Sequence, residues 1–416
     1  MVVTPTGGET ASSVARPFAS DPRRLRRLIR TLQAGTLMMS CTYGVMFTML
    51  DDYRDAYGIA EGLLGLVVAI GFFTSFVAQL TLAPLADRGH TKRLIVVGFL
   101  LVIAGGMAMG FGETATLILA GRFVMGVGGG MALPALRRVI IVADPEHLGD
   151  NMGRLVSVDV AGFALGPVIA VATVDTIGIP APFVVISAVI VVILVMLLRV
   201  QVPETAEDER PSERFAFDLL TNRGVAGAVM IGLALFLMIG TFDSLWAVMM
   251  DDLEAPSWMA NLGITLFVLP MVVLGPYGGR LSQRLGPYRM GSAGMLLGAL
   301  FMCCYGLLPS PNLMMAVFLF HVINDGLTVT SAGIAVGMAA PPERQAGAQG
   351  LLGGVQTLMG GIAASAAGWS YDSLGRGVTF CASAILMALL IVAGYTMAGE
   401  HRTRRGAPEA LEPAPA

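Results

Sequence analysis

The feature that most constrains this chain is a series of twelve apolar runs, each close to the roughly 20 residues that a helix needs to cross a bilayer. Only 13% of the 416 residues are charged, about half of what a soluble protein of this length carries on its surface. The pattern therefore predicts an all-α membrane protein with twelve transmembrane helices. The runs are 31–50, 62–84, 94–112, 115–136, 152–174, 181–200, 224–250, 258–279, 290–308, 312–338, 348–369 and 377–398.

The longest polar interruption, 201–222, divides these runs into two sets of six. We therefore expect an N-terminal tail (1–27), a six-helix half (28–200), the linker (201–222), a second six-helix half (223–398) and a C-terminal tail (399–416). A basic segment, RRLRRLIR (23–30), precedes the first run as it would in a signal peptide. That run is longer than a signal core and many similar runs follow it, so we interpret it as the first span.

Lysine and arginine are unevenly distributed between the polar segments. If the N-terminus is cytoplasmic, all of them except Arg54, Arg122 and Arg376 fall in cytoplasmic loops and tails. This is the bias that the positive-inside rule requires. We therefore expect a multi-pass protein with both termini cytoplasmic. Because the sequence shows no eukaryotic targeting segment, we expect the bacterial cytoplasmic membrane.

The two halves resemble each other in sequence. APLADRGHTKR (83–93) aligns with GRLSQRLGPYR (279–289), and GRLVSVD (153–159) aligns with GLLGGVQ (350–356), which pairs Asp159 with Gln356. Two six-helix halves related by an axis along the membrane normal form a transporter architecture, with the substrate site near the midplane between them. We expect two pseudo-symmetric six-helix bundles.

The first of these segments resembles the loop signature of the major facilitator superfamily, Gly-x-Leu-Ala-Asp-Arg-x-Gly-Arg-Lys, and the likeness extends over nearly the full chain. The resemblance implies that Asp87 and Arg88 form a gating loop that holds the outward-open state. An acid at a helix end can join two rigid bodies in one state and release them in the other. The positions that match are Leu85, Ala86, Asp87, Arg88 and Lys92, while Ala83, His90 and Thr91 depart from the signature.

A second motif, GFALGPVIA (162–170), resembles the antiporter signature of the same family through Gly162, Gly166 and Pro167. Ala170 and the following valine replace its final glycines. Glycines four residues apart flatten one helix face and proline weakens the hydrogen-bond ladder, so the motif favours a site of helix bending. Ordinary close packing of small residues is the alternative.

Charged side chains inside the spans are the candidates for proton coupling: Arg122, Asp159 and Asp325. Arg122 resembles the arginine of the family's fourth-span motif, which is linked to proton coupling, and it lies roughly 10 Å below the outer surface. Asp159 lies about 12 Å from the inner end of its span. Ionisable groups at such depths usually line cavities and form proton relays. A structural ion pair for Asp159 and snorkelling of Arg122 remain alternatives.

Polar groups in the second half are candidates for the substrate cavity: Gln356, Asn324, His321 and Asp243. Asn324 and His321 lie beside Asp325 in the segment HVINDG. An apolar span seldom carries three such groups unless it lines a water-filled cavity. A structural histidine, and an Asp243 that only reaches the interface, are the alternatives.

Together these features predict a proton-coupled secondary transporter that exports a small amphipathic or drug-like molecule by alternating access. Proton-coupled uptake of a metabolite and a non-transporting receptor on the same fold are the alternatives. An enzyme is not predicted, because the sequence lacks HExxH, GxSxG and Walker motifs. We expect the substrate, protons and membrane lipid as partners, a monomer, and no nucleic acid, cofactor or metal.

Overall fold

The computed structural model describes residues 21–403, apart from the side chains of 260–267. Within this part of the chain every regular element is a helix. Nine of its helical segments are long and apolar enough to cross a membrane. The expectations for residues 1–20 and 404–416, which make up most of the two tails, lie outside the described residues.

Residues 22–198 form the first bundle, whose six long helices are α2 and α4 to α8. Asp21 caps α2 by accepting hydrogen bonds from the backbone N–H groups of Arg23 (3.1 Å) and Arg24 (3.2 Å). The elements are α2 (Pro22–Thr48), α3 (Leu50–Tyr57), α4 (Glu61–Thr81), the 3₁₀ helix η1 (Ala83–Arg88), α5 (Thr91–Gly110), α6 (Ala115–Ala143), α7 (Leu148–Ile177) and α8 (Pro180–Leu198).

The second bundle follows a linker that contains η2 (Glu207–Glu209) and η3 (Phe217–Thr221). In this bundle α12 and α13 together form one spanning unit. The long α14 forms two, which meet at Gly375, where φ is 81° and ψ is 168°, a conformation that glycine alone adopts readily. The elements are α9 (Arg223–Asp252), α10 (Ser257–Leu285), α11 (Pro287–Leu307), α12 (Pro311–Thr328), α13 (Ser331–Ala339), η4 (Pro342–Arg344), α14 (Gln345–Met397) and η5 (Gly399–Thr403).

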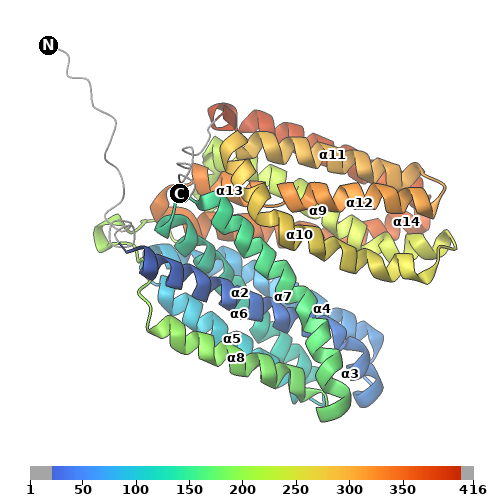
Figure 1. Cartoon of the computed structure of the whole chain (residues 1–416), viewed down its shortest axis with the longest axis horizontal. Coiled ribbons are helices and arrows are strands. Elements are labelled where there is room, and N and C mark those ends of the chain that lie inside the picture. The colour runs from blue at the N-terminus through green and yellow to red at the C-terminus, as the bar shows by residue number, and fades with distance from the viewer. Residues whose placement is uncertain (1–20, 404–416) are drawn as a thin grey trace, which may run out of the picture.

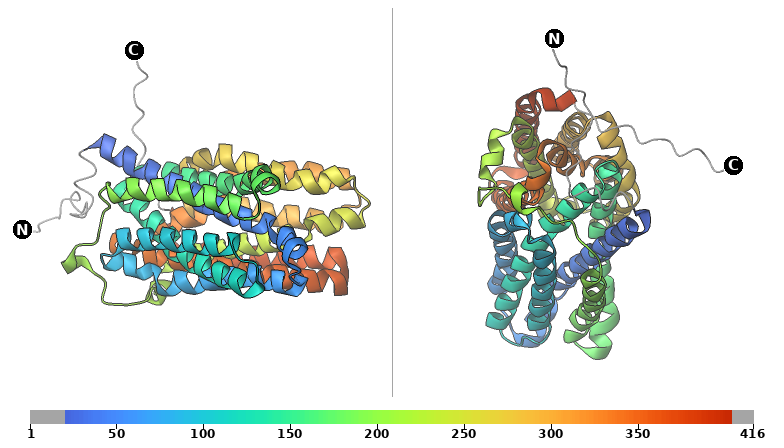
Figure 2. Two further views of the ribbon diagram at one scale, coloured as in Figure 1. Left: turned by 90° about the horizontal axis from the view of Figure 1, so that it is seen from below. Right: turned by 90° about the vertical axis from the view of Figure 1, so that its left-hand side faces the viewer.

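Together with α2, α10 and the second half of α14, the nine segments make twelve spanning units, arranged as two six-helix bundles as the sequence predicts. Figure 1 shows the first bundle in blue to light green below the second in yellow to red, and the right-hand view of Figure 2 shows the two stacked when seen from one end. Each bundle has its own apolar core, one built from residues between Leu28 and Leu197 and one from residues between Ala216 and Ala398. Ala346 is the residue of the second half that joins the first core.

The two bundles touch near the end at which α2, α7 and α14 begin, which we call the contact end. It lies on the left in Figure 1, where α2 begins. The described hydrogen bonds between the bundles join η1 with α14, α7 with α10, and α4 with α14 toward this end. The contact end therefore holds the groups that keep the bundles together in this conformation.

One expected span boundary is wrong in a way that matters for the site. The fourth run was expected to end at residue 136, but α6 continues to Ala143. Arg137 and Arg138 therefore lie within the helix and not in a loop. The predicted span ends before Arg137 because two arginines lower the hydropathy of the sequence at that point. In the fold, both guanidinium groups face carboxylates inside the protein.

Candidate functional site

Asp87 of the predicted gating loop lies in η1 at the contact end and is 1% exposed. Its carboxylate oxygens accept hydrogen bonds from the backbone N–H groups of Ala346 (2.9 Å) and Gly347 (2.6 Å). These residues belong to the first turn of α14, where the helix dipole favours a negative charge. A carboxylate of the first bundle therefore caps a helix of the second. The described hydrogen bonds of this cap do not include Arg88, which is half-buried.

Asp87 also has a cationic partner in its own bundle. The Nε atom of Arg138 on α6 lies 3.2 Å from the Asp87 carboxylate, and both side chains are 1% exposed. The other guanidinium nitrogens of Arg138 donate to the Thr91 hydroxyl (3.0 Å), the Pro203 carbonyl (2.8 Å) and the Thr205 hydroxyl (2.6 Å). These bonds matter because a buried ion pair is tolerated only where its remaining donors are also satisfied.

The linker fastens both bundles at the contact end. Glu204 accepts hydrogen bonds from the backbone N–H groups of Thr91 and Lys92, both at 2.8 Å, and so caps α5 in the first bundle. Further along, Asp218 receives two hydrogen bonds from Arg344, at 2.6 and 3.0 Å, just before α14 in the second bundle. The linker therefore binds both bundles at the contact end, where Asp87 also joins them.

A second contact between the bundles is made by glycines of α7 and α10. A Cβ atom at Gly149 would strike the carbonyl oxygen of Gly279, and one at Gly153 would strike that of Gly275. Gln283 accepts a hydrogen bond from the Gly149 N–H at 2.6 Å. The two helices therefore touch backbone to backbone, as small residues allow in membranes.

Asp159 lies on α7 beyond this glycine contact, toward the middle of the helix. Its carboxylate accepts a hydrogen bond from the Ser40 hydroxyl of α2 and interacts electrostatically with Arg137 of α6. The Nη1 atom of Arg137 lies 3.6 Å from the position that a Cβ atom would take at Gly353 on α14. Arg137 therefore lies between Asp159 and the second bundle.

Arg122 has different surroundings from those of Asp159. It is 2% exposed, and its Cζ atom lies 5.2 Å from the ring centre of Tyr43 and 5.8 Å from that of Phe72. Among the described residues its Nε and Nη1 atoms have no hydrogen-bond acceptor. Tyr43 interacts electrostatically with both Arg122 and Asp159 and so connects the two. The burial of Arg122 argues against snorkelling.

In the second bundle, His321 and Asp325 lie one turn apart on α12 and are each 2% exposed. The Nε2 atom of His321 lies 3.3 Å from the Asp325 carboxylate and 3.3 Å from the Met238 sulfur. Its Nδ1 atom lies 3.1 Å from the Tyr305 hydroxyl, and the Phe242 ring packs edge-on at 5.5 Å. His321, which we predicted in the substrate cavity, therefore lies inside the aromatic core of the bundle.

Two further predicted residues gather around Asp325. Asn324 donates hydrogen bonds to the Gly294 carbonyl (3.1 Å) and to the Asp325 carboxylate (3.3 Å). Asp243 is exposed on α9 and interacts electrostatically with Asp325. The structure therefore brings Asp243, His321, Asn324 and Asp325 together in one bundle, apart from Asp159.

Gln356, the repeat mate of Asp159, lies apart from this group. It is 7% exposed and its amide nitrogen lies 3.5 Å from the Gly232 carbonyl of α9, within its own bundle. The residue that reaches the first bundle at this level is its neighbour Thr357, whose hydroxyl accepts a hydrogen bond from Gln79 at 3.3 Å. The polar contact across the interface is therefore made by the residue that follows Gln356, and the place of Gln356 in a substrate cavity stays a prediction.

Comparison with known proteins decides the family. Two overlapping segments, residues 33–247 and 228–416, match the model of the Major Facilitator Superfamily. The chain belongs to this superfamily. The predicted resemblance is thereby confirmed, and the protein is a membrane transporter by family.

Curated relatives match part of the chain, among them one exporter and one drug-resistance protein. The bacillibactin exporter of Bacillus subtilis (strain 168) is 29% identical over 168 residues, which are 39% of this chain and 40% of that protein. The quinolone resistance protein NorA of Staphylococcus aureus is 26% identical over 125 residues, which are 30% of this chain and 32% of that protein. The matched segments therefore span less than half of either relative.

Solved structures of the superfamily match over nearly their full lengths. The human organic anion transporter MFSD10 (TETRAN) has a TM-score of 0.76 at 14% identity, covering 89% of this chain and 99% of that one. The proton:xylose symporter XylE has a TM-score of 0.76 at 13% identity, covering 92% and 98%. At such identities the likeness shows the fold, and it confirms the twelve-helix, two-bundle architecture.

The antiporter-like motif of this superfamily member lies where α7 crosses α2. A Cβ atom at Gly162 would strike the Leu37 carbonyl, and one at Gly166 would lie 2.6 Å from the Cys41 carbonyl oxygen. Pro167 follows inside the helix. The glycines therefore serve close packing, while bending at this motif stays a prediction.

Sequence reasoning missed Arg137 and Arg138, which it counted as loop charges of the positive-inside pattern. A usable signal was present, because the segment VIIVA (139–143) continues the apolar run directly after the two arginines. No glycine or proline separates the arginines from that segment. A helix that continues past two charges indicates that acceptors for them lie within the fold.

Proposed function

We propose that this superfamily member is a proton-coupled exporter of a small amphipathic or drug-like molecule that works by alternating access. Its two bundles, each with a separate core, are the rigid bodies that such a cycle needs. The partial likeness to the bacillibactin exporter supports export over uptake, and the likeness to a quinolone resistance protein supports a drug-like substrate. In this proposal the contact end faces the cytoplasm of a bacterial cell, because the arginine-rich start of α2 lies there.

The observation that carries the proposal is the position of Asp159. It is an ionisable side chain inside a membrane helix, held by a hydroxyl and an arginine that reaches toward the opposite bundle. Movement of α14 away from Arg137 would change the electrostatic surroundings of Asp159 within each cycle. A carboxylate whose cationic partner shifts between two states can take a proton in one state and release it in the other.

The gate of the proposed cycle is the cap that Asp87 provides to α14. This cap exists only while the bundles are together at the contact end, so it stabilises the state that is closed toward the cytoplasm. In this proposal Arg138 orients the Asp87 carboxylate, and the linker holds Arg138. Arg88 has no part in the cap.

The experiment uses everted membrane vesicles with an acidic lumen. Cationic, neutral and anionic amphipaths are added in turn while lumenal pH is recorded for the wild type, Asp159→Asn and the control Asp51→Asn. Asp51 is an exposed residue of α3, so it separates a local effect from a general loss of charge. We expect substrate-driven loss of lumenal protons in the wild type and the control, and none in Asp159→Asn.

Two results would contradict the proposal. Proton release that survives in Asp159→Asn would remove Asp159 from the coupling path and leave Asp325 and Asp243 as carriers. No response to any amphipath would count against export, and proton-linked uptake of metabolites into right-side-out vesicles would then be the alternative to measure.

A further inference from the structure

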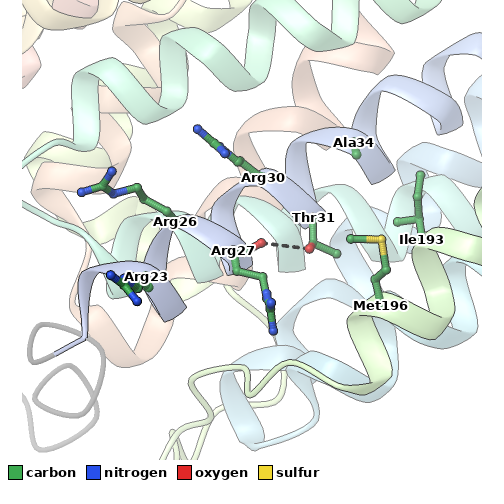
Figure 3. A pocket seen from close by; sticks show the side chains of 8 residues that line it. All are labelled: Arg23, Arg26, Arg27, Arg30, Thr31, Ala34, Ile193 and Met196. Atoms are coloured by element: carbon green, nitrogen blue, oxygen red, sulfur yellow. Dashed lines mark hydrogen bonds between the residues drawn. The ribbon is translucent and has the colours of Figure 1, made fainter.

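A basic pocket between α2 and α8, outside the transport site, has no role in the proposed cycle. Its volume is about 770 Å³, and Figure 3 shows the side chains that line it. The first nine residues of α2 contribute four exposed arginines: Arg23, Arg26, Arg27 and Arg30. This pocket combines a high local charge with a wall that enters the bilayer.

The four arginines lie on one side of α2. Their spacing of three and four residues places them along one helix face over about 10 Å of its length. Among residues 21–403 no acidic side chain forms an ion pair with any of the four. The nearby Asp21 pairs with Arg24, which does not line the pocket, at 3.0 Å. The pocket therefore presents uncompensated positive charge.

The same face becomes apolar as α2 enters the membrane. The arginines are followed by Thr31 and Ala34, and α8 adds Ile193 and Met196 on the facing side (Figure 3). Met196 is 47% exposed on the outer surface of the bundle. The pocket thus has a cationic outer part and an apolar inner part, in the order in which a phospholipid presents its headgroup and its acyl chains.

The end of α8 does not offset this charge. Its terminal carbonyl groups would attract cations, but the Lys92 ammonium donates to the carbonyls of Leu198 and Val200, both at 2.9 Å. The N-terminal end of α2 is already capped by the Asp21 carboxylate, so the positive charge of the pocket comes from the four guanidinium groups. The side chains that line the pocket therefore carry four positive charges and no negative charge.

We propose that this pocket binds the headgroup of an anionic phospholipid, with an acyl chain lying along Ala34, Ile193 and Met196. Guanidinium groups bind phosphate oxygens in pairs, and basic pockets beside membrane helices suit such headgroups. A soluble phosphate would use the arginines alone and would leave the apolar wall without a function. The inference does not depend on the substrate or the direction of transport.

The experiment is native mass spectrometry of the purified full chain in detergent, with phosphatidylglycerol or phosphatidylcholine added in equal amounts. We compare the wild type, the triple variant Arg26→Gln/Arg27→Gln/Arg30→Gln and a control triple variant, Arg214→Gln/Arg289→Gln/Arg402→Gln. The control removes the same charge from exposed arginines that do not line the pocket. Thermal unfolding without added lipid verifies that each variant is folded.

We expect the wild type to retain one phosphatidylglycerol more tightly than phosphatidylcholine. The pocket variant should lose roughly 100-fold in affinity, because each basic residue facing an anionic lipid contributes about a factor of five. The control should stay within about twofold of the wild type. A fourth variant, Ala34→Trp, keeps every arginine but fills the apolar part, and it should also lose the lipid.

Three results would overturn the proposal. One is equal retention of the two lipids by the wild type. Another is an equal loss in the pocket and control variants, which would mean that net charge alone attracts the lipid. The third is displacement of the lipid by inorganic phosphate together with unchanged binding in Ala34→Trp, which would make the pocket a site for a free anion.

Discussion

The two bundles share one architecture but hold their buried charge differently. In the first bundle, Asp159 faces Arg137 and Asp87 pairs with Arg138, so each buried carboxylate has a guanidinium partner. In the second bundle, Asp325 lies beside His321, and within residues 21–403 no lysine or arginine pairs with it. The fold repeat therefore does not repeat the chemistry. Permanent cations hold the carboxylates of the first bundle, whereas the ionisable neighbours of Asp325 are His321 and Asp243, which carry no permanent positive charge.

The largest expected effect tests whether Arg137 depends on its carboxylate. Asp159→Ala leaves the Arg137 charge inside the bundle without its partner, so the free energy of unfolding should fall by about 3 kcal/mol. Unfolding titrations with a denaturing detergent measure this change. A loss below about 1 kcal/mol would mean that water already compensates Arg137, and the contrast between the bundles would weaken.

The next largest effect is the interaction energy between Asp159 and Arg137. Adding Arg137→Leu to Asp159→Ala removes the unpaired cation, so the double variant should recover about 2 kcal/mol of the free energy of unfolding. The four members of the double-mutant cycle are measured under one set of conditions. Strictly additive losses would show that the two residues do not interact in the folded protein.

A smaller effect of opposite sign is expected at Arg122. Its Nε and Nη1 atoms have no acceptor among the described residues, so an apolar replacement relieves a buried polar group. Arg122→Leu should raise the free energy of unfolding by about 1 kcal/mol and abolish substrate-driven proton movement. Gain of stability with loss of transport would indicate a functional charge. Destabilisation would instead indicate that Tyr43 and Phe72 hold a structural cation.

The smallest effect is expected at the carboxylate of the second bundle. Asp325→Asn keeps the shape of the side chain and leaves no cation unpaired, so the free energy of unfolding should change by less than about 1 kcal/mol. The same titration gives the value, with Asp159→Asn measured beside it. A larger loss at Asp325 than at Asp159 would reverse the proposed contrast between the bundles.

The sequence predicts the spans well, because one long apolar run gives one helix in a bilayer. Its errors fall where a helix contains charged residues. α6 was expected to end before Arg137, and α2 begins at Pro22, ahead of the first apolar run, because its opening turns are rich in arginine. Hydropathy measures one segment at a time, so it cannot register the acceptor that another segment provides.

The candidate site was predictable only in part, for the same reason. The motif around Asp87 indicates a gate, but its acceptor role toward Ala346 depends on contact between residues far apart in the chain. Likewise, the spacing in HVINDG puts His321 near Asp325, as observed, yet cannot show that Met238 and Tyr305 enclose the histidine. Spacing predicts neighbours on one helix, and packing alone determines the neighbours on others.

The cap on α14 has an evolutionary consequence, because a single substitution there could change the balance between the conformations of this protein. An ordinary N-cap contributes about 0.5–2 kcal/mol to the stability of its own helix whatever the protein is doing. Here the capping group belongs to the other bundle, so in the proposed cycle this energy would stabilise one conformation only and would bias the two populations by roughly two- to thirtyfold. Replacing one side chain at Asp87 could therefore reset the resting balance of the molecule while leaving both bundles intact.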